Sequence, residues 1–130
     1  MSEHDTQASF VNWCQWNEMR YPMLMMAFAI PNGAHLAGDA RTRAIKMARL
    51  KAEGFKPGVP DWCLPYPCGG YNGLWIEFKH GKNSLSQYQT DYIVLLEQYK
   101  HCVKVCYTVD EAIRAVEEYF NPIHQMVTYP

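Results

Sequence analysis

The sequence predicts a layered α/β domain, in which helices pack on the faces of a mixed β-sheet. Short apolar runs typical of strands alternate along the chain with longer stretches of helical periodicity. The composition is that of a globular protein, with 48% hydrophobic and 19% charged residues. No repeat or linker divides the 130 residues, and this length suits one hydrophobic core. We therefore expect residues 1–130 to form one domain.

Charge and hydropathy narrow the classes of function. The formal net charge is −1, so binding of a polyanion requires a local basic patch. The longest apolar run, residues 23–30, is far too short to span a membrane. The polar N-terminus, MSEHDTQ, does not resemble a signal peptide. We therefore expect a cytoplasmic protein without a membrane partner, whose five cysteines are reduced thiols.

The N-terminal third is predicted to be a helix followed by a strand. Residues 5–18 have helical periodicity, with one stripe formed by Glu3, Gln7, Phe10 and Cys14. Pro22 ends this helix, and the run MLMMAFAI at 23–30 is predicted to be a buried strand, with a buried helical turn as the alternative. Asn32-Gly33 is a turn dipeptide, and we assign no role to His35.

Residues 41–51 are predicted to form a basic helix that ends at Gly54 as its C-cap. Between residues 38 and 56 there are six basic and two acidic side chains, a local net charge of 6 − 2 = +4. This helix is a candidate surface for a phosphate backbone, although a charged helix face is also an ordinary solvated surface. The first candidates for such contacts are Arg41, Arg43 and Lys46, with Lys82 further along the chain.

Residues 58–81 are predicted to form two short strands joined by a glycine-rich turn. Side chains alternate between the faces of a strand, so Leu74, Ile76 and Phe78 should face the core. Glu77 and Lys79 then share the opposite face with Trp75. Antiparallel pairing brings Asp61, at the start of the first strand, beside Glu77 and Lys79 at the end of the second.

The last third is predicted to contain a helix, a strand and a second helix. Ser86 and Gln89 have the spacing of a capping box, so a helix should begin near Gln87. Its apolar stripe comprises Tyr88, Tyr92, Leu95, Leu96 and Tyr99. Residues 101–108 are predicted to be a short strand. Residues 109–120 are predicted to be a helix that packs through Ala112, Ile113, Val116 and Tyr119, followed by an extended tail.

Asp61, Glu77 and Lys79 form the minimum set of side chains for cutting a phosphodiester. Carboxylates on rigid elements hold Mg²⁺ or Mn²⁺, and the backbone carbonyl of Phe78 could complete the metal's ligands. Such an ion polarises a phosphoryl oxygen and activates a bound water. A lysine then stabilises the developing negative charge or orients that water. An isolated Glu-x-Lys pair on a solvent-facing strand is nevertheless common and carries little information alone.

The run from Lys51 to Gln89 resembles the VRR-NUC branch of the PD-(D/E)XK nucleases, in particular small standalone phage and bacterial members. Pro60-Asp61 matches the PD of that pattern, and residues 77–79 (EFK) match its E-x-K. Residues 85–89 (LSQYQ) match the glutamine motif on the next helix, which ends at Gln89. An acidic residue on the first helix also belongs to the pattern, and Glu3 fits it better than Glu18. A contiguous V-R-R signature is absent.

The resemblance implies a restriction-endonuclease-like α-β-β-β-α-β core and a metal-dependent nuclease related to Holliday junction resolvases. It implies metal ligation by Asp61 and Glu77, a catalytic Lys79, and supporting roles for Gln89 and Glu3. Standalone relatives are expected to form homodimers, and a symmetric junction needs two cuts where one 15.1 kDa domain carries one site. We therefore expect a Mg²⁺- or Mn²⁺-dependent endonuclease selective for branched DNA.

Several alternatives stay open at this point. A nicking or restriction-like nuclease without junction preference has the same motifs, and a non-catalytic DNA-binding module could share the fold. Gln89 could act only as a helix cap. Tyr66 or Tyr71 on the hairpin could contact substrate. A zinc site is a weaker alternative, built from cysteine pairs spaced within or near the range of zinc ligands: Cys63 with Cys68, and Cys102 with Cys106.

Overall fold

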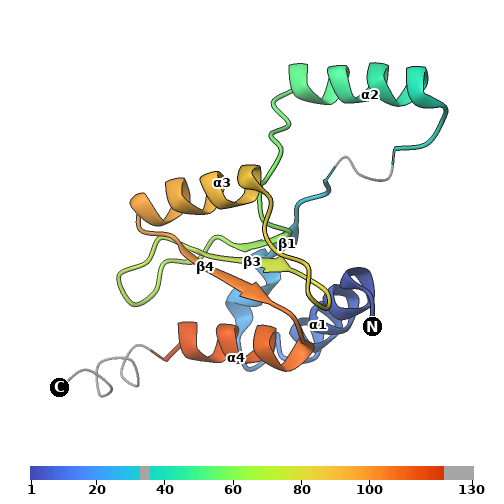
Figure 1. The fold of residues 1–130 in the computed structure, drawn as a ribbon. Coiled ribbons are helices and arrows are strands. Elements are labelled where there is room, and N and C mark those ends of the chain that lie inside the picture. Colours follow the sequence, from blue (N-terminus) through green and yellow to red (C-terminus); the bar gives the residue numbers. More distant parts are fainter. Residues whose placement is uncertain (33–35, 122–130) are drawn as a thin grey trace.

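The computed structural model describes residues 1–32 and 36–121, and its centre is a four-stranded mixed sheet (Figure 1). The strands lie in the order β1 (Phe28–Ala29), β2 (Trp62–Leu64), β3 (Leu74–Phe78) and β4 (Cys102–Cys106). β1 pairs with β2 and β2 with β3 in antiparallel fashion, whereas β3 and β4 are parallel. The predicted mixed α/β architecture is therefore confirmed.

Helices cover both faces of the sheet. α1 (Glu3–Trp16) and α4 (Val109–Tyr119) pack together on one face, and α3 (Gln87–Gln98) lies on the other (Figure 1). Phe10 of α1 is fully buried, with ring centroids 4.9 Å from Trp62 and 5.7 Å from Phe78. Burial of such a ring contributes roughly 2–3 kcal/mol. These contacts fix α1 across the ends of β2 and β3.

The two terminal helices differ slightly from their predicted bounds. α1 begins at Glu3 rather than residue 5, because Ser2 and Asp5 form a capping box that the stripe of apolar residues does not reveal. It ends at Trp16, and Asn17 is its C-cap. α4 buries the predicted Ala112, Val116 and Tyr119. The described residues do not include Gly33 or His35. They also do not include the predicted extended tail from residue 122 onwards.

The buried strand predicted at residues 23–30 is wrong for most of its length. Residues Pro22–Met26 form a 3₁₀ helix, η1, and only Phe28 and Ala29 pair with β2. Leu24 is buried, whereas Met25 and Phe28 are exposed. A proline pre-sets the backbone angle for a first helical turn, and an eight-residue apolar run does not distinguish a strand from such a turn. The predicted alternative, a buried helical turn, is correct in its helical geometry for residues 22–26, but only Leu24 of them is buried.

The hairpin has the predicted register. Trp62 pairs with Ile76, and Leu64 pairs with Leu74. One step further along both strands places Asp61 opposite Glu77. The core-facing side chains of β3, which are Leu74, Ile76 and Phe78, are fully buried, as the alternation predicts. The hairpin therefore delivers the two carboxylates to one end of the sheet.

The basic helix α2 (Ala40–Ala52) stands apart from the rest of the domain (Figure 1). Asp39 caps its N-terminus through the Thr42 amide, at 2.8 Å. At its other end the Phe55 amide donates to the Leu50 carbonyl and the Gly54 amide to the Lys51 carbonyl, a Schellman motif with Gly54 at positive φ. None of its residues is buried, and no described helix or strand packs extensively against it.

The apolar stripe predicted for α3 is mostly exposed. Only Leu96 is buried, whereas Tyr88, Leu95 and Tyr99 are exposed. The prediction of the stripe as a packing face is therefore wrong within this chain. The helix itself begins at Gln87 behind the predicted capping box of Ser86 and Gln89. No helix in the described parts of the chain is long and apolar enough to cross a membrane.

Candidate active site

Asp61 stands immediately before β2, where the backbone holds it on both sides. The buried Pro60 precedes it. The backbone carbonyl of Asp61 accepts a hydrogen bond from the Ile30 amide at 2.8 Å. Its side-chain Oδ2 accepts from the backbone amide of Phe78 at 2.8 Å. The carboxylate is therefore oriented by two neighbouring strands rather than by a flexible loop.

Glu77 lies beside Asp61, and its side chain is only 3% exposed. Burial, and after it the negative charge of Asp61, raises the pKa of Glu77 to about 9. Burial likewise raises the pKa of Asp61, while the hydrogen bond from Phe78 lowers it. The ammonium of Lys79 favours the charged form of both carboxylates. A buried carboxylate next to a half-buried one is stabilised by a cation.

The sequence leaves helix capping and contact with the carboxylates as alternatives for Gln89, and its side chain makes both contacts. Its Oε1 accepts from the Ser86 amide at 2.9 Å and completes the capping box of α3. Its Nε2 donates to Oε2 of Glu77 at 3.3 Å. The same side chain therefore caps α3 and reaches the carboxylate pair.

Glu3, and not Glu18, lies near the carboxylate pair. The charge of Glu3 raises the pKa of both Asp61 and Glu77, and Nδ2 of Asn83 approaches its Oε2 at 3.5 Å. Glu3 and Asp61 also line one open cavity of about 370 Å³ between α1 and the segment after β1. Glu18 lines a different cavity, next to Cys14 and Trp62.

The donor atoms at this end of the sheet suit a hard cation. Asp61 and Glu77 offer carboxylate oxygens, which Mg²⁺ and Mn²⁺ prefer. The amide and carbonyl of one strand residue point to the same side, so the Phe78 carbonyl is expected on the side of Asp61. Within residues 1–32 and 36–121 no group of three or more histidine, cysteine or acidic side chains could hold a metal. A protein-bound ion would thus have two carboxylates and would keep several waters.

The cysteines do not form the alternative zinc site among the described residues. Cys63 of β2 is buried, and burial raises the pKa of its thiol to about 11. Cys106 is buried too, and its pKa is raised to about 12. Zinc ligation needs thiolates, and burial without a partner charge disfavours them.

The candidate DNA contacts lie on two separate segments. Arg41, Arg43 and Lys46 are exposed on α2, and Lys46 Nζ donates to the Ala37 carbonyl at 2.9 Å. Lys82 is exposed between β3 and α3. Tyr66 and Tyr71 belong to the other end of the hairpin, where they pack near Tyr119 and Phe120.

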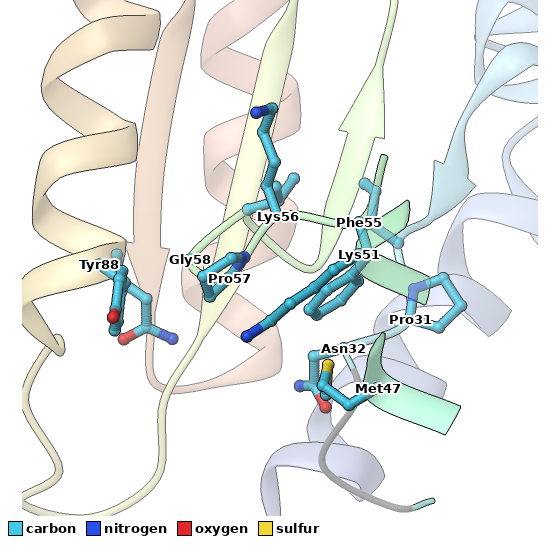
Figure 2. A pocket seen from close by; sticks show the side chains of 12 residues that line it. Pro31, Asn32, Met47, Lys51, Phe55, Lys56, Pro57, Gly58 and Tyr88 are labelled. Carbon is cyan, nitrogen blue, oxygen red and sulfur yellow. The ribbon is translucent and has the colours of Figure 1, made fainter. Parts of the chain in front are cut away.

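Two features next to the carboxylates are not evident in the sequence motifs. The first is a cleft of about 410 Å³ between α2 and the start of α3, whose walls include Lys51, Phe55 and Tyr88 (Figure 2). The second is Asn83, whose contact with Glu3 joins segments 80 residues apart. Asn83 carries no motif signal. Of the cleft residues, only Lys51 and Lys56 belong to a stretch that the sequence marks, the basic residues between 38 and 56.

Comparison with known proteins supports the fold. No family model matches the sequence, and no curated protein matches it. A solved structure described as "VRR_NUC domain protein" aligns with a TM-score of 0.76 at 23% sequence identity. The alignment covers 94% of this chain and 90% of that one. The chain therefore has the fold of a VRR_NUC domain protein over nearly its whole length.

Proposed function

We propose that this protein is a metal-dependent endonuclease of the VRR-NUC type that hydrolyses phosphodiester bonds in DNA. The observation that carries the proposal is the pair of half-buried Asp61 and buried Glu77, with Lys79 two residues on and Gln89 donating to Glu77. This is the order of the PD-(D/E)XK motif, at the strand ends of a VRR_NUC-like fold. A buried carboxylate beside a half-buried one destabilises the site without metal, so the arrangement calls for a cation.

Asp61, Glu77 and the Phe78 carbonyl would hold a Mg²⁺ or Mn²⁺ ion. Such an ion, when bound, lowers the pKa of a water ligand and polarises a phosphoryl oxygen. The Phe78 amide keeps the Asp61 carboxylate oriented, and Gln89 does the same for Glu77. Lys79 places a fixed positive charge where negative charge develops on the phosphoryl oxygens, or orients the attacking water. Glu3 supports the site from α1.

The substrate we propose is branched DNA, cut by a homodimer in the cytoplasm of a bacterial or phage-infected cell. One 15.1 kDa chain offers one carboxylate pair, whereas a symmetric junction needs two cuts. The exposed cations of α2 and Lys82 are the proposed contacts to the phosphate backbone. A nicking or restriction-like enzyme without junction preference differs from this proposal in substrate alone.

The experiment is a cleavage assay on Holliday junctions, flaps and plain duplexes with Mg²⁺, Mn²⁺ or EDTA. We expect products with either metal, none with EDTA, and none from Lys79→Ala. Lys104→Ala, which removes an exposed lysine from β4, serves as the matched control and should cut normally. DNA binding that is insensitive to EDTA, with no product from any substrate, would contradict the proposed nuclease activity and favour a non-catalytic DNA-binding module. Equal rates on junctions and duplexes would remove the junction preference.

A further inference from the structure

The helix α2 is well formed, although no other helix or strand among the described residues packs extensively against it. It has 13 residues, is capped at both ends, and buries no side chain. Isolated helices of about 12–15 residues are marginal in water, because most helical stability comes from packing. A helix held away from its own domain therefore needs a second surface.

Exposed apolar residues occur on both α2 and α3, the two helices that contribute residues to the walls of one cleft. Ile45 of α2 is 48% exposed, Leu95 of α3 is 50% exposed, and Tyr99, the C-cap of α3, is 63% exposed. The cleft between the two helices is lined by Met47 and Phe55 on one side and Tyr88 on the other (Figure 2). Its volume of about 410 Å³ accommodates several large side chains but not a whole helix.

The charges of the two helices are complementary. Residues 40–52 contain five arginines and lysines and no acid, whereas residues 87–98 contain Asp91 and Glu97 and no base. A surface with apolar and basic side chains and a surface with apolar and acidic side chains therefore occur on the same chain. A second copy of this chain supplies both at once, and a twofold axis makes the contact reciprocal.

We infer that α2 is a dimerisation arm, which lies over the cleft of a second copy and packs its Ile45 side against the partner's α3. This inference rests on the proposed homodimer and names its interface. Ala48 and Ala52, three and seven residues after Ile45, share its side of α2, so two backbones can approach closely there. Arg43 lies on the opposite side of α2 and stays free for DNA. Since Gln89 also lines the cleft, the partner's arm borders the active site.

The test is the mass of the purified protein by light scattering after size exclusion, at about 50 µM and at lower concentrations. We expect twice 15.1 kDa for the wild type, and 15.1 kDa for Ile45→Glu and for Leu95→Glu. Met19→Glu is the matched control, because Met19 is 97% exposed outside both helices and its variant should stay dimeric. A monomeric wild type, or a dimer that survives both Ile45→Glu and Leu95→Glu, overturns the inference.

Two further readouts separate this inference from the proposed function. Hydrogen exchange should show protected α2 amides in the wild type and an α2 that exchanges freely in Ile45→Glu, with the amides of β3 unchanged in both. Lys79→Ala should lose cleavage and remain dimeric. A monomer that still cuts DNA would contradict the dimerisation arm and support the proposed nuclease activity. A dimer without cleavage activity would support the arm and contradict the nuclease activity.

Discussion

The side chain of Asp61 accepts a hydrogen bond from the backbone amide of Phe78 at 2.8 Å, across two antiparallel strands. Asp61→Ala should abolish cleavage and also lower the free energy of unfolding by about 1–3 kcal/mol, because a part-buried donor loses its acceptor. Asp61→Asn retains an acceptor oxygen for Phe78 but not the charge. We expect it to abolish cleavage while nearly restoring stability, measured by urea denaturation. Full activity in Asp61→Asn would show that the carboxylate charge is not required.

The raised pKa of Glu77 predicts an unusual pH dependence of stability without metal. The folded state holds a proton on Glu77 up to about pH 9, whereas the unfolded state loses it near 4.5. The folded state thus binds more protons between these values, so the free energy of unfolding should fall as pH rises through this window. Thermal unfolding in EDTA should show the decline, and Glu77→Gln should flatten it. A rise with pH would contradict the assignment.

Metal binding should reverse that trend. A divalent cation replaces the proton on the carboxylate pair, so its affinity increases with pH. We expect Mn²⁺ to raise the melting temperature more at pH 8.5 than at pH 6, by the linkage of binding to folding. Asp61→Asn should lose the increase at both pH values. Calcium, which binds carboxylates but need not support catalysis, provides a check that separates binding from cleavage.

The two hydrogen bonds of Gln89 can be separated by mutation. Ser86→Ala removes the N-cap of α3 and should cost about 1 kcal/mol of stability while leaving the contact of Gln89 with Glu77 available. Gln89→Ala should cost a similar amount and, in addition, slow cleavage by about 10- to 100-fold. The comparison is made on kcat at saturating metal. Equal loss of kcat in both variants would mean that Gln89 acts only through the helix.

Gly58 is expected to tolerate no side chain. It has φ of +90°, and a Cβ there would lie 2.3 Å from the carbonyl oxygen of Tyr88. Gly70, with φ of +88° and no atom within 4 Å of such a Cβ, is the matched control. Backbone strain costs about 1–3 kcal/mol at either position, and Gly58→Ala adds a clash with the first turn of α3. We expect a clearly larger loss of stability, and slower cleavage, for Gly58→Ala than for Gly70→Ala.

The placement of the side chains at this end of the sheet could be predicted because it depends on local rules. Strand alternation and hairpin pairing place Glu77 opposite Asp61, and the capping box places Gln89 at the first turn of α3. Each rule acts over a few residues, and each holds in the structure. Capping of α3 and contact with Glu77 do not exclude each other for Gln89, since an amide side chain has both a donor and an acceptor.

The predictions that are wrong involve contacts that a periodic pattern does not identify. The pattern of residues 23–30 reports only that they are apolar, and η1 buries Leu24 while leaving Met25 exposed. The stripe of α3 has helical spacing, but an apolar stripe does not specify whether it packs within its own chain. The sequence likewise does not show that α2 stands apart from the domain, because its 13 residues have the pattern of an ordinary basic helix.

The double contact of Gln89 restricts what can replace it. A glutamate could still accept from the Ser86 amide but would bring a further negative charge toward Glu77, and an asparagine is one methylene shorter. Leucine or methionine would fill the space and make neither hydrogen bond. In a library of all substitutions at this position, no variant should therefore cut as fast as the protein with glutamine, and a helix cap becomes the least replaceable side chain on α3.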